Sequence, residues 1–117
     1  MAEMNKMIQE FEKSRVQLSA IESQGQSLTM QAKILEDALK ELTETKEKKV
    51  YKAVGNILIL TDVKKMEKDL SDQKESVDLR AKTVKKQEEA MLDKLNKLKG
   101  EIESAQKSLK GEGKEAK

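Results

Sequence analysis

The side chains that most often carry out chemistry are scarce in this chain. It contains no histidine and no cysteine, so a histidine-based catalytic triad and an imidazole or thiolate metal site are both excluded. The carboxylates of Asp69 and Asp72 lie among lysines, which is typical of a solvated helix face rather than of a general acid and base. Gly55-Asn56 lacks the further glycines and the lysine of a phosphate-binding loop. We therefore expect no catalysis, no cofactor and no bound metal.

The composition favours long helices over a compact globule. Of the 117 residues, 39% are charged and 2% are aromatic, and proline is absent. This usage is typical of a coiled coil, and the length suits a single domain, residues 1–117. The net charge of +2, with both signs interspersed, provides no basic face for nucleic acid. No apolar run approaches the roughly 20 residues of a membrane span. We expect a soluble, cytoplasmic protein with no nucleic-acid or membrane partner.

The one stretch that is typical of β-structure surrounds Gly55-Asn56, a pair that supplies the positive φ of a tight hairpin turn. Along the second strand, isoleucines point to one face and leucines to the other. An isolated two-stranded hairpin is marginal in water, and open apolar edges promote association. We therefore predict that residues 50–61 form an oligomerisation hairpin that other chains complete. Its contact residues would be Val50, Tyr51, Val54, Ile57, Leu58, Ile59 and Leu60.

Two segments with heptad patterns flank this hairpin. In the first, alternating steps of three and four residues give a seam in which ten of twelve positions are apolar, the exceptions being Ser14 and Gly25. A second seam runs from Val77 to Leu109 and is broken only by Glu88, while polar residues before Val77 predict a local adjustment of the coil. We predict helices over residues 1–49 and 62–109 and a flexible tail over residues 110–117. The first seam comprises Met4, Met7, Phe11, Ser14, Leu18, Ile21, Gly25, Leu28, Ala32, Leu35, Leu39 and Leu42.

Two seamed segments joined by a tight turn most simply fold back on each other. The predicted fold is mainly α, a long antiparallel two-helix coiled coil joined by a β-hairpin. Leu39 and Leu42 would then lie near Leu70, and residues 7–11 near residues 98–102. The free end gathers methionines and other apolar residues, which either close the coil or form an exposed groove for apolar segments of another protein. These candidate residues are Met4, Met7, Ile8, Phe11, Leu98, Ile102 and Leu109.

Residues 50–59, Val-Tyr-Lys-Ala-Val-Gly-Asn-Ile-Leu-Ile, resemble the Tyr-Lys…Gly…Leu-Ile signature of the β-class prefoldin subunits. The flanking heptads and the two-helix plan extend the resemblance over nearly the whole chain, and its single hairpin separates it from the α class. The absence of glutamine-rich extensions resembles archaeal members. The resemblance implies a hexamer of two α-class and four β-class subunits, whose hairpins join into inter-subunit β-barrels.

The same resemblance implies an ATP-independent holdase. Such a chaperone would capture unfolded client proteins at the apolar coil ends and deliver them to a group II chaperonin. The alternative from the residues alone is a structural coiled coil, either a homo-oligomer or a filament subunit, which binds no client. Exposed apolar surface at the coil ends distinguishes the two hypotheses, because only the chaperone requires it.

Overall fold

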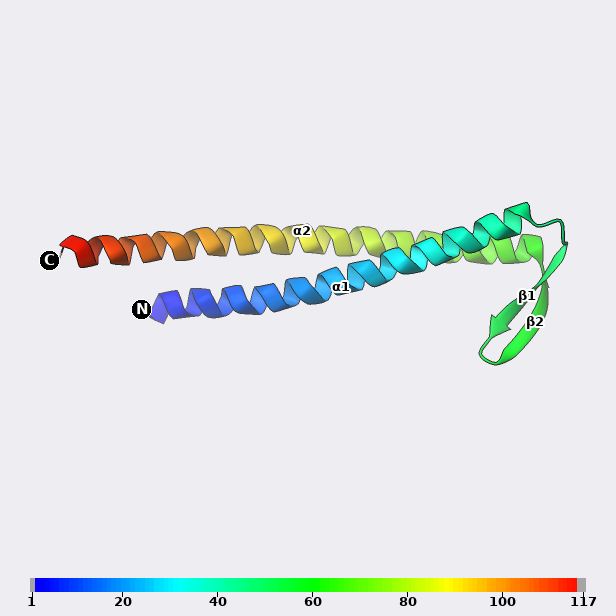
Figure 1. The fold of residues 1–117 in the computed structure, drawn as a ribbon, viewed down its shortest axis with the longest axis horizontal. Coiled ribbons are helices and arrows are strands. Elements are labelled where there is room, and N and C mark those ends of the chain that lie inside the picture. Colours follow the sequence, from blue (N-terminus) through cyan, green and yellow to red (C-terminus); the bar gives the residue numbers. More distant parts are fainter. Residues whose placement is uncertain (1, 116–117) are drawn as a thin grey trace. The chain divides into compact units, whose positions relative to one another are not determined.

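The computed structural model describes residues 2–115, with side chains described as far as Leu109. It contains helix α1 (Ala2–Glu44), strands β1 (Lys49–Val54) and β2 (Ile57–Asp62), and helix α2 (Val63–Glu115), in that order (Figure 1). This confirms the predicted fold of two long helices joined by an antiparallel hairpin. The chain divides into two compact units. One is made of Met1–Gln24 with Val84–Lys117, and the other, Gly25–Thr83, contains the hairpin.

The helix ends differ from those predicted. Helix α1 ends at Glu44 instead of continuing to Lys49. There the Thr45 Oγ1 accepts a hydrogen bond from the Glu47 backbone N–H at 3.2 Å, and such a local side-chain bond competes with the helical pattern. Helix α2 continues to Glu115, past the predicted end at Leu109, because glycine lowers helix propensity without forbidding a helix. The predicted flexible tail thus begins in a helix, and its last residues, 116–117, lie outside the described part.

The predicted seams are the buried faces of the helices. In α1, every seam position is buried or half-buried, including Ser14 and Gly25, whereas most other positions are exposed. In α2, the same holds from Val77 to Ala105. The expected adjustment before Val77 does not interrupt α2. Lys74 takes the seam position, half-buried, and its Nζ lies 2.9 Å from the Asp78 Oδ2.

Each unit has a small apolar core of its own. In Gly25–Thr83, the buried apolar side chains are Leu28, Val63 and Val77. In the other unit they are Leu18, Val84 and Leu95. Burial of a side chain of this size contributes about 1.5–3 kcal/mol, so the packing of each unit depends on few residues.

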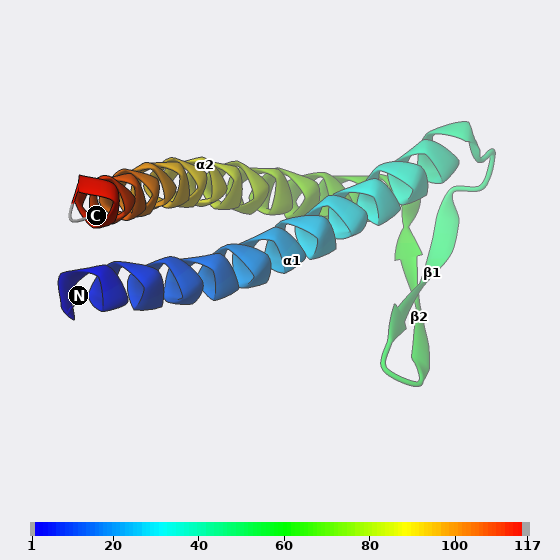
Figure 2. The same ribbon diagram turned by 60° about the vertical axis from the view of Figure 1, so that its left-hand side comes forward.

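The hairpin is regular. Strands β1 and β2 pair from Lys49–Asp62 to Val54–Ile57, and the Val63 N–H donates a further hydrogen bond to the Lys48 carbonyl at 2.9 Å. Within the turn Gly55 has a φ of 60°, while no non-glycine residue in the described chain has a positive φ. Glycine at the first central position is the signature of a type II′ turn, whose twist matches that of the strands. Figure 2 shows the two strands as a twisted ribbon.

Candidate functional site

The first candidate site is the hairpin surface, which consists of Val50, Tyr51, Val54 and the residues from Ile57 to Leu60. The strand register places Tyr51, Ala53, Leu58 and Leu60 on one face, because cross-strand partners share a face. All four are exposed, and Tyr51 and Leu58 are 67% and 66% exposed. The charged residues on this face are the paired Lys49 and Asp62, at the end of the strands next to the helices. A contiguous apolar patch of this kind marks an interaction site.

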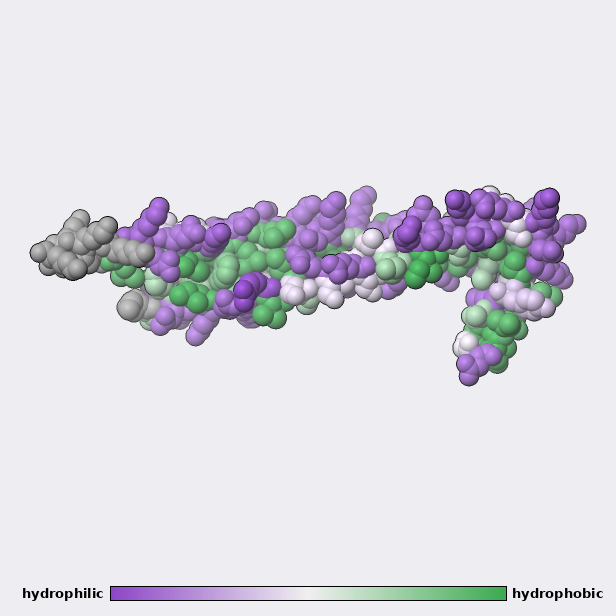
Figure 3. All heavy atoms as spheres, in the orientation of Figure 1, coloured by the Kyte–Doolittle hydropathy of each residue, from purple (hydrophilic) through white to green (hydrophobic). Residues whose placement is uncertain are grey.

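The opposite face of the hairpin is also apolar but is partly covered. Val54, Ile57 and Ile59 are exposed there, whereas Val50 and Lys52 are half-buried. The register pairs Lys52 with Ile59, so one charge lies within this apolar face. In the space-filling view, apolar residues (green) gather over the hairpin, with polar residues at its turn (Figure 3).

Backbone groups add to the apolar surface. The sheet that the structure describes has two strands, so each strand has one edge without a neighbouring strand. Free edges present unpaired N–H and C=O groups that can pair with a strand of another chain. The hairpin surface therefore offers both apolar contacts and backbone hydrogen bonds to a partner.

The second candidate site is the helix-end surface, formed by Met4, Met7, Ile8 and Phe11 of α1 and Leu98, Ile102 and Leu109 of α2. The structure places all seven in one compact unit. None is buried, because Ile8 and Leu109 are exposed and the other five are half-buried. Each of these side chains is therefore only partly covered by the rest of the chain, and each retains apolar surface that another molecule can contact.

An ion pair defines how the two helices align at this surface. The Lys94 Nζ donates a hydrogen bond to the Glu10 Oε1 at 2.7 Å, and both side chains are about half exposed. The hydrogen bond from Lys94, followed by its charge, lowers the pKa of the Glu10 carboxyl. The pair brings residue 10 next to residue 94, whereas the proximity of residues 7–11 to residues 98–102 stays a prediction.

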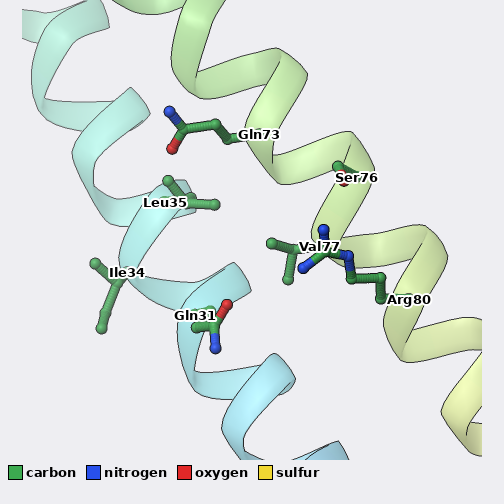
Figure 4. A pocket seen from close by; sticks show the side chains of 7 residues that line it. All are labelled: Gln31, Ile34, Leu35, Gln73, Ser76, Val77 and Arg80. Carbon is green, nitrogen blue, oxygen red and sulfur yellow. The ribbon is translucent and has the colours of Figure 1, made fainter.

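A groove in Gly25–Thr83 was not singled out from the sequence. Its volume is about 380 Å³, and Leu35 and Val77 point into the space between the helices, whereas Ile34 points away from α2 (Figure 4). Ile34 lies next to a seam position and is 60% exposed, a signal that a search of off-seam apolar residues would have found. The groove is lined by Gln31, Ile34, Leu35, Gln73, Ser76, Val77 and Arg80.

The described residues contain no group of three acidic, histidine or cysteine side chains placed to hold a metal ion. None of the described helices has a stretch that is long and apolar enough to cross a membrane.

Known proteins share this arrangement of two helices and a hairpin. Residues 5–109 match the family described as prefoldin subunit. A prefoldin subunit beta from Pyrobaculum neutrophilum is 31% identical over 111 residues, which cover 94% of this chain and 88% of the relative. Another, from Sulfurisphaera tokodaii, is 30% identical over 108 residues and covers 86% and 81% of the two chains. The crystal structure of the prefoldin beta subunit from Thermococcus strain KS-1 matches with a TM-score of 0.84 at 25% identity, covering 90% of this chain and 93% of that one.

The chain belongs to the prefoldin family. The resemblance to β-class subunits that the hairpin motif indicated is confirmed by these relatives, which come from archaea. Prefoldin is a family of chaperones, and its beta subunits form hetero-oligomers with other prefoldin subunits. Membership of this family implies a chaperone role for the chain.

Proposed function

We propose that this chain is the β-class subunit of an ATP-independent holdase. In this proposal, two α-class and four β-class subunits form a hexamer through β-barrels built from their hairpins. The hexamer captures unfolded proteins at the helix-end surfaces and delivers them to a group II chaperonin. A cytoplasmic location stays a prediction.

The observation that carries the assembly part is the fully exposed apolar face of the hairpin. Tyr51, Leu58 and Leu60 are each more than half exposed in the single chain. An exposed face of this size, together with two free strand edges, is unfavourable in water until other strands cover it. The hairpins of partner subunits would meet both needs. Their apolar side chains would cover the exposed face, and their backbone groups would pair with the free strand edges.

The client-binding part is supported by the partial exposure of the helix-end surface. An unfolded protein exposes apolar segments of varied sequence, and methionine suits such partners because its side chain is flexible and polarizable. Met4 and Met7 are half-buried and Ile8 is 39% exposed, so apolar area is available there without unfolding of the chain.

The mass in solution tests the assembly. The chain is measured by light scattering alone and after mixing with an α-class prefoldin subunit. A defined hexamer in the mixture is the expected result. A single homo-oligomer whose mass does not change when the α-class subunit is added would favour the structural or filament alternative instead.

Suppression of aggregation, without ATP, tests client binding in the mixed complex. We expect a variant with Met7, Phe11, Leu98 and Ile102 replaced by serine to lose most of its suppression. The matched control replaces Met30, Ile34 and Leu79 by serine, which are exposed apolar residues of the Gly25–Thr83 unit. Because four serines in a seam also weaken the coil, Ile8→Ser serves as a milder variant, and partial loss is expected. Full suppression by both helix-end variants would contradict client binding at this surface.

A further inference from the structure

Ser14 is an unusual residue for the buried seam of α1. Its side chain is 0% exposed, and it is the one fully buried side chain in the described part of the chain. Its Oγ has no hydrogen-bond partner, and no other buried side-chain N or O atom among the described residues lacks one. A buried hydroxyl that has lost water and gained no partner is destabilising where it lies.

The other polar side chains of the two seams do not have this defect. Lys74 is bonded to Asp78 and is about one-third exposed. Glu88 is half-buried, so its carboxylate keeps some access to water. Ser14 is also smaller than the leucines of the same seam, so it contributes less apolar contact. It is therefore a weak point in the helix packing of its unit.

Ser14 lies at the boundary between closely and loosely packed residues. Leu18, one helical turn toward the hairpin, is buried, whereas Phe11, Met7 and Met4 on the other side are only half-buried. Glu10 lies one turn from Ser14, and its pair with Lys94 places Ser14 opposite the part of α2 around Met91. The ion pair itself is exposed, and such pairs contribute little to stability.

We propose that Ser14 is the release point of the helix end. The segment from Ala2 to Glu12 separates from α2 as a unit, with Ser14 as its limit, and this opening exposes Met7 and Phe11 to the apolar segments of an unfolded protein. Ser14 is thus a positioning residue, because it sets the population of the open state and does not itself bind client. The coupling to capture rests on the proposed function above, whereas the opening does not.

Hydrogen exchange in the assembled complex tests the opening. Ser14→Ala removes the unpaired hydroxyl at nearly constant volume, so it should slow amide exchange of residues 6–12 about tenfold. The first helical residues are left out because their N–H groups have no helical partner. The matched control is Ser19→Ala, an exposed residue of the same helix, which tests the gain in helix propensity alone. Unchanged or faster exchange in Ser14→Ala, or equal slowing in both variants, would overturn the proposal.

Client affinity tests the coupling. The probe is reduced, carboxymethylated α-lactalbumin, a chain that stays unfolded. If capture requires the open state, the apparent Kd rises by the same factor as exchange slows, about tenfold, because both report the open population. Slower exchange with an unchanged Kd would overturn the coupling. Failure of the wild-type complex to bind the probe would remove the proposed function, while the exchange result still decides whether the helix end opens at Ser14.

A cross-link between two introduced cysteines gives the strongest test. The chain has no native cysteine, so within it the linker joins only the introduced positions. Glu10→Cys with Lys94→Cys, joined by a short bis-maleimide, would hold the helix end closed and should weaken capture of the probe at least tenfold, leaving only the binding that the partly exposed side chains support. The control link joins Glu36→Cys to Lys74→Cys in the Gly25–Thr83 unit. The hydrogen bond to Asp78 is the main cause that raises the pKa of Lys74, and the charge of Glu36 adds to it. Capture should persist in the control. Full capture by the complex linked between positions 10 and 94 would overturn the proposal.

Discussion

The two apolar surfaces of this protein differ in how they are covered. The hairpin surface exposes one whole face and most of the other, and it leaves backbone groups free along both edges. The helix-end surface is half-buried by its own chain, with five of its seven residues of intermediate exposure. Permanent interfaces resemble the core of a domain cut in half, so full exposure in a single chain suits a permanent partner. Partial burial within the chain suits a temporary partner, because the apolar side chains can pack against their own chain again when the partner dissociates.

The largest effect is expected from a charged residue introduced into the hairpin surface. Ile59→Lys places a charge on an apolar strand face opposite Lys52, and a charge without a partner is costly to bury. We expect loss of the proposed hexamer by light scattering, with helix content by circular dichroism unchanged. The control is Leu79→Lys, on an exposed site of α2 that is 60% exposed. An intact hexamer in Ile59→Lys would contradict the role of the hairpin in assembly.

Truncation of a core residue should show how much the helix end depends on burial. Leu95 is 8% exposed, and Leu95→Ala should lower the free energy of unfolding by about 2–3 kcal/mol. Leu92 lies nearby on the same helix but is 40% exposed, so Leu92→Ala should cost less than about 1 kcal/mol. Urea unfolding followed by circular dichroism measures both. Equal losses would mean that Leu92 is covered in the functional assembly.

Two glycines should respond with opposite signs. Gly55→Ala forces a side chain into a φ of 60° and should destabilise the hairpin by about 1 kcal/mol, although no atom would clash with the new methyl group. Gly100→Ala, in α2 and also in open space, should stabilise the chain by about 1 kcal/mol through helix propensity. Thermal unfolding of the two variants tests the pair. Destabilisation by Gly100→Ala would reveal a close neighbour of Gly100 in the assembly.

The smallest effect is expected from the ion pair at the helix end. The pKa of Glu10 is lowered by Lys94, so the folded state favours the carboxylate. The stabilisation is therefore present above the ordinary pKa of glutamate and is lost as the pH falls through the lowered value. Glu10→Gln should lower the Tm slightly at neutral pH and not at all in acid or in molar salt. A difference in Tm that persists in acid would contradict the pairing.

The regular elements of the fold could be predicted because their signals are local and repetitive. The heptad positions of α1 are the buried ones, and symmetry about Gly55-Asn56 predicts the Lys48–Val63 backbone contact. The helix ends were predicted less well. At the end of α1, a local hydrogen bond to Thr45 competes with the helical pattern. Periodicity carries no information on such a bond.

The sequence predicted some features of the candidate sites and missed others. The apolar hairpin face follows from strand alternation, and its exposure follows from the lack of further strands in the sequence. Ser14 was visible only as a polar exception in a seam, because its complete burial and missing partner depend on side-chain packing. The groove near Arg80 was missed, since its shape depends on how a long side chain lies across neighbouring residues.

The hydrogen bond between Val63 and Lys48 has a consequence for the order of folding. It closes a loop of few residues, whereas the Glu10–Lys94 pair joins positions that are 84 residues apart in the sequence. Short loops lose less chain entropy on closure, so the helices should zip from the hairpin toward the chain ends. During synthesis, α1 leaves the ribosome with its seam uncovered until most of α2 has followed. The residues that are proposed to bind unfolded proteins are thus the last to be covered when the subunit itself folds.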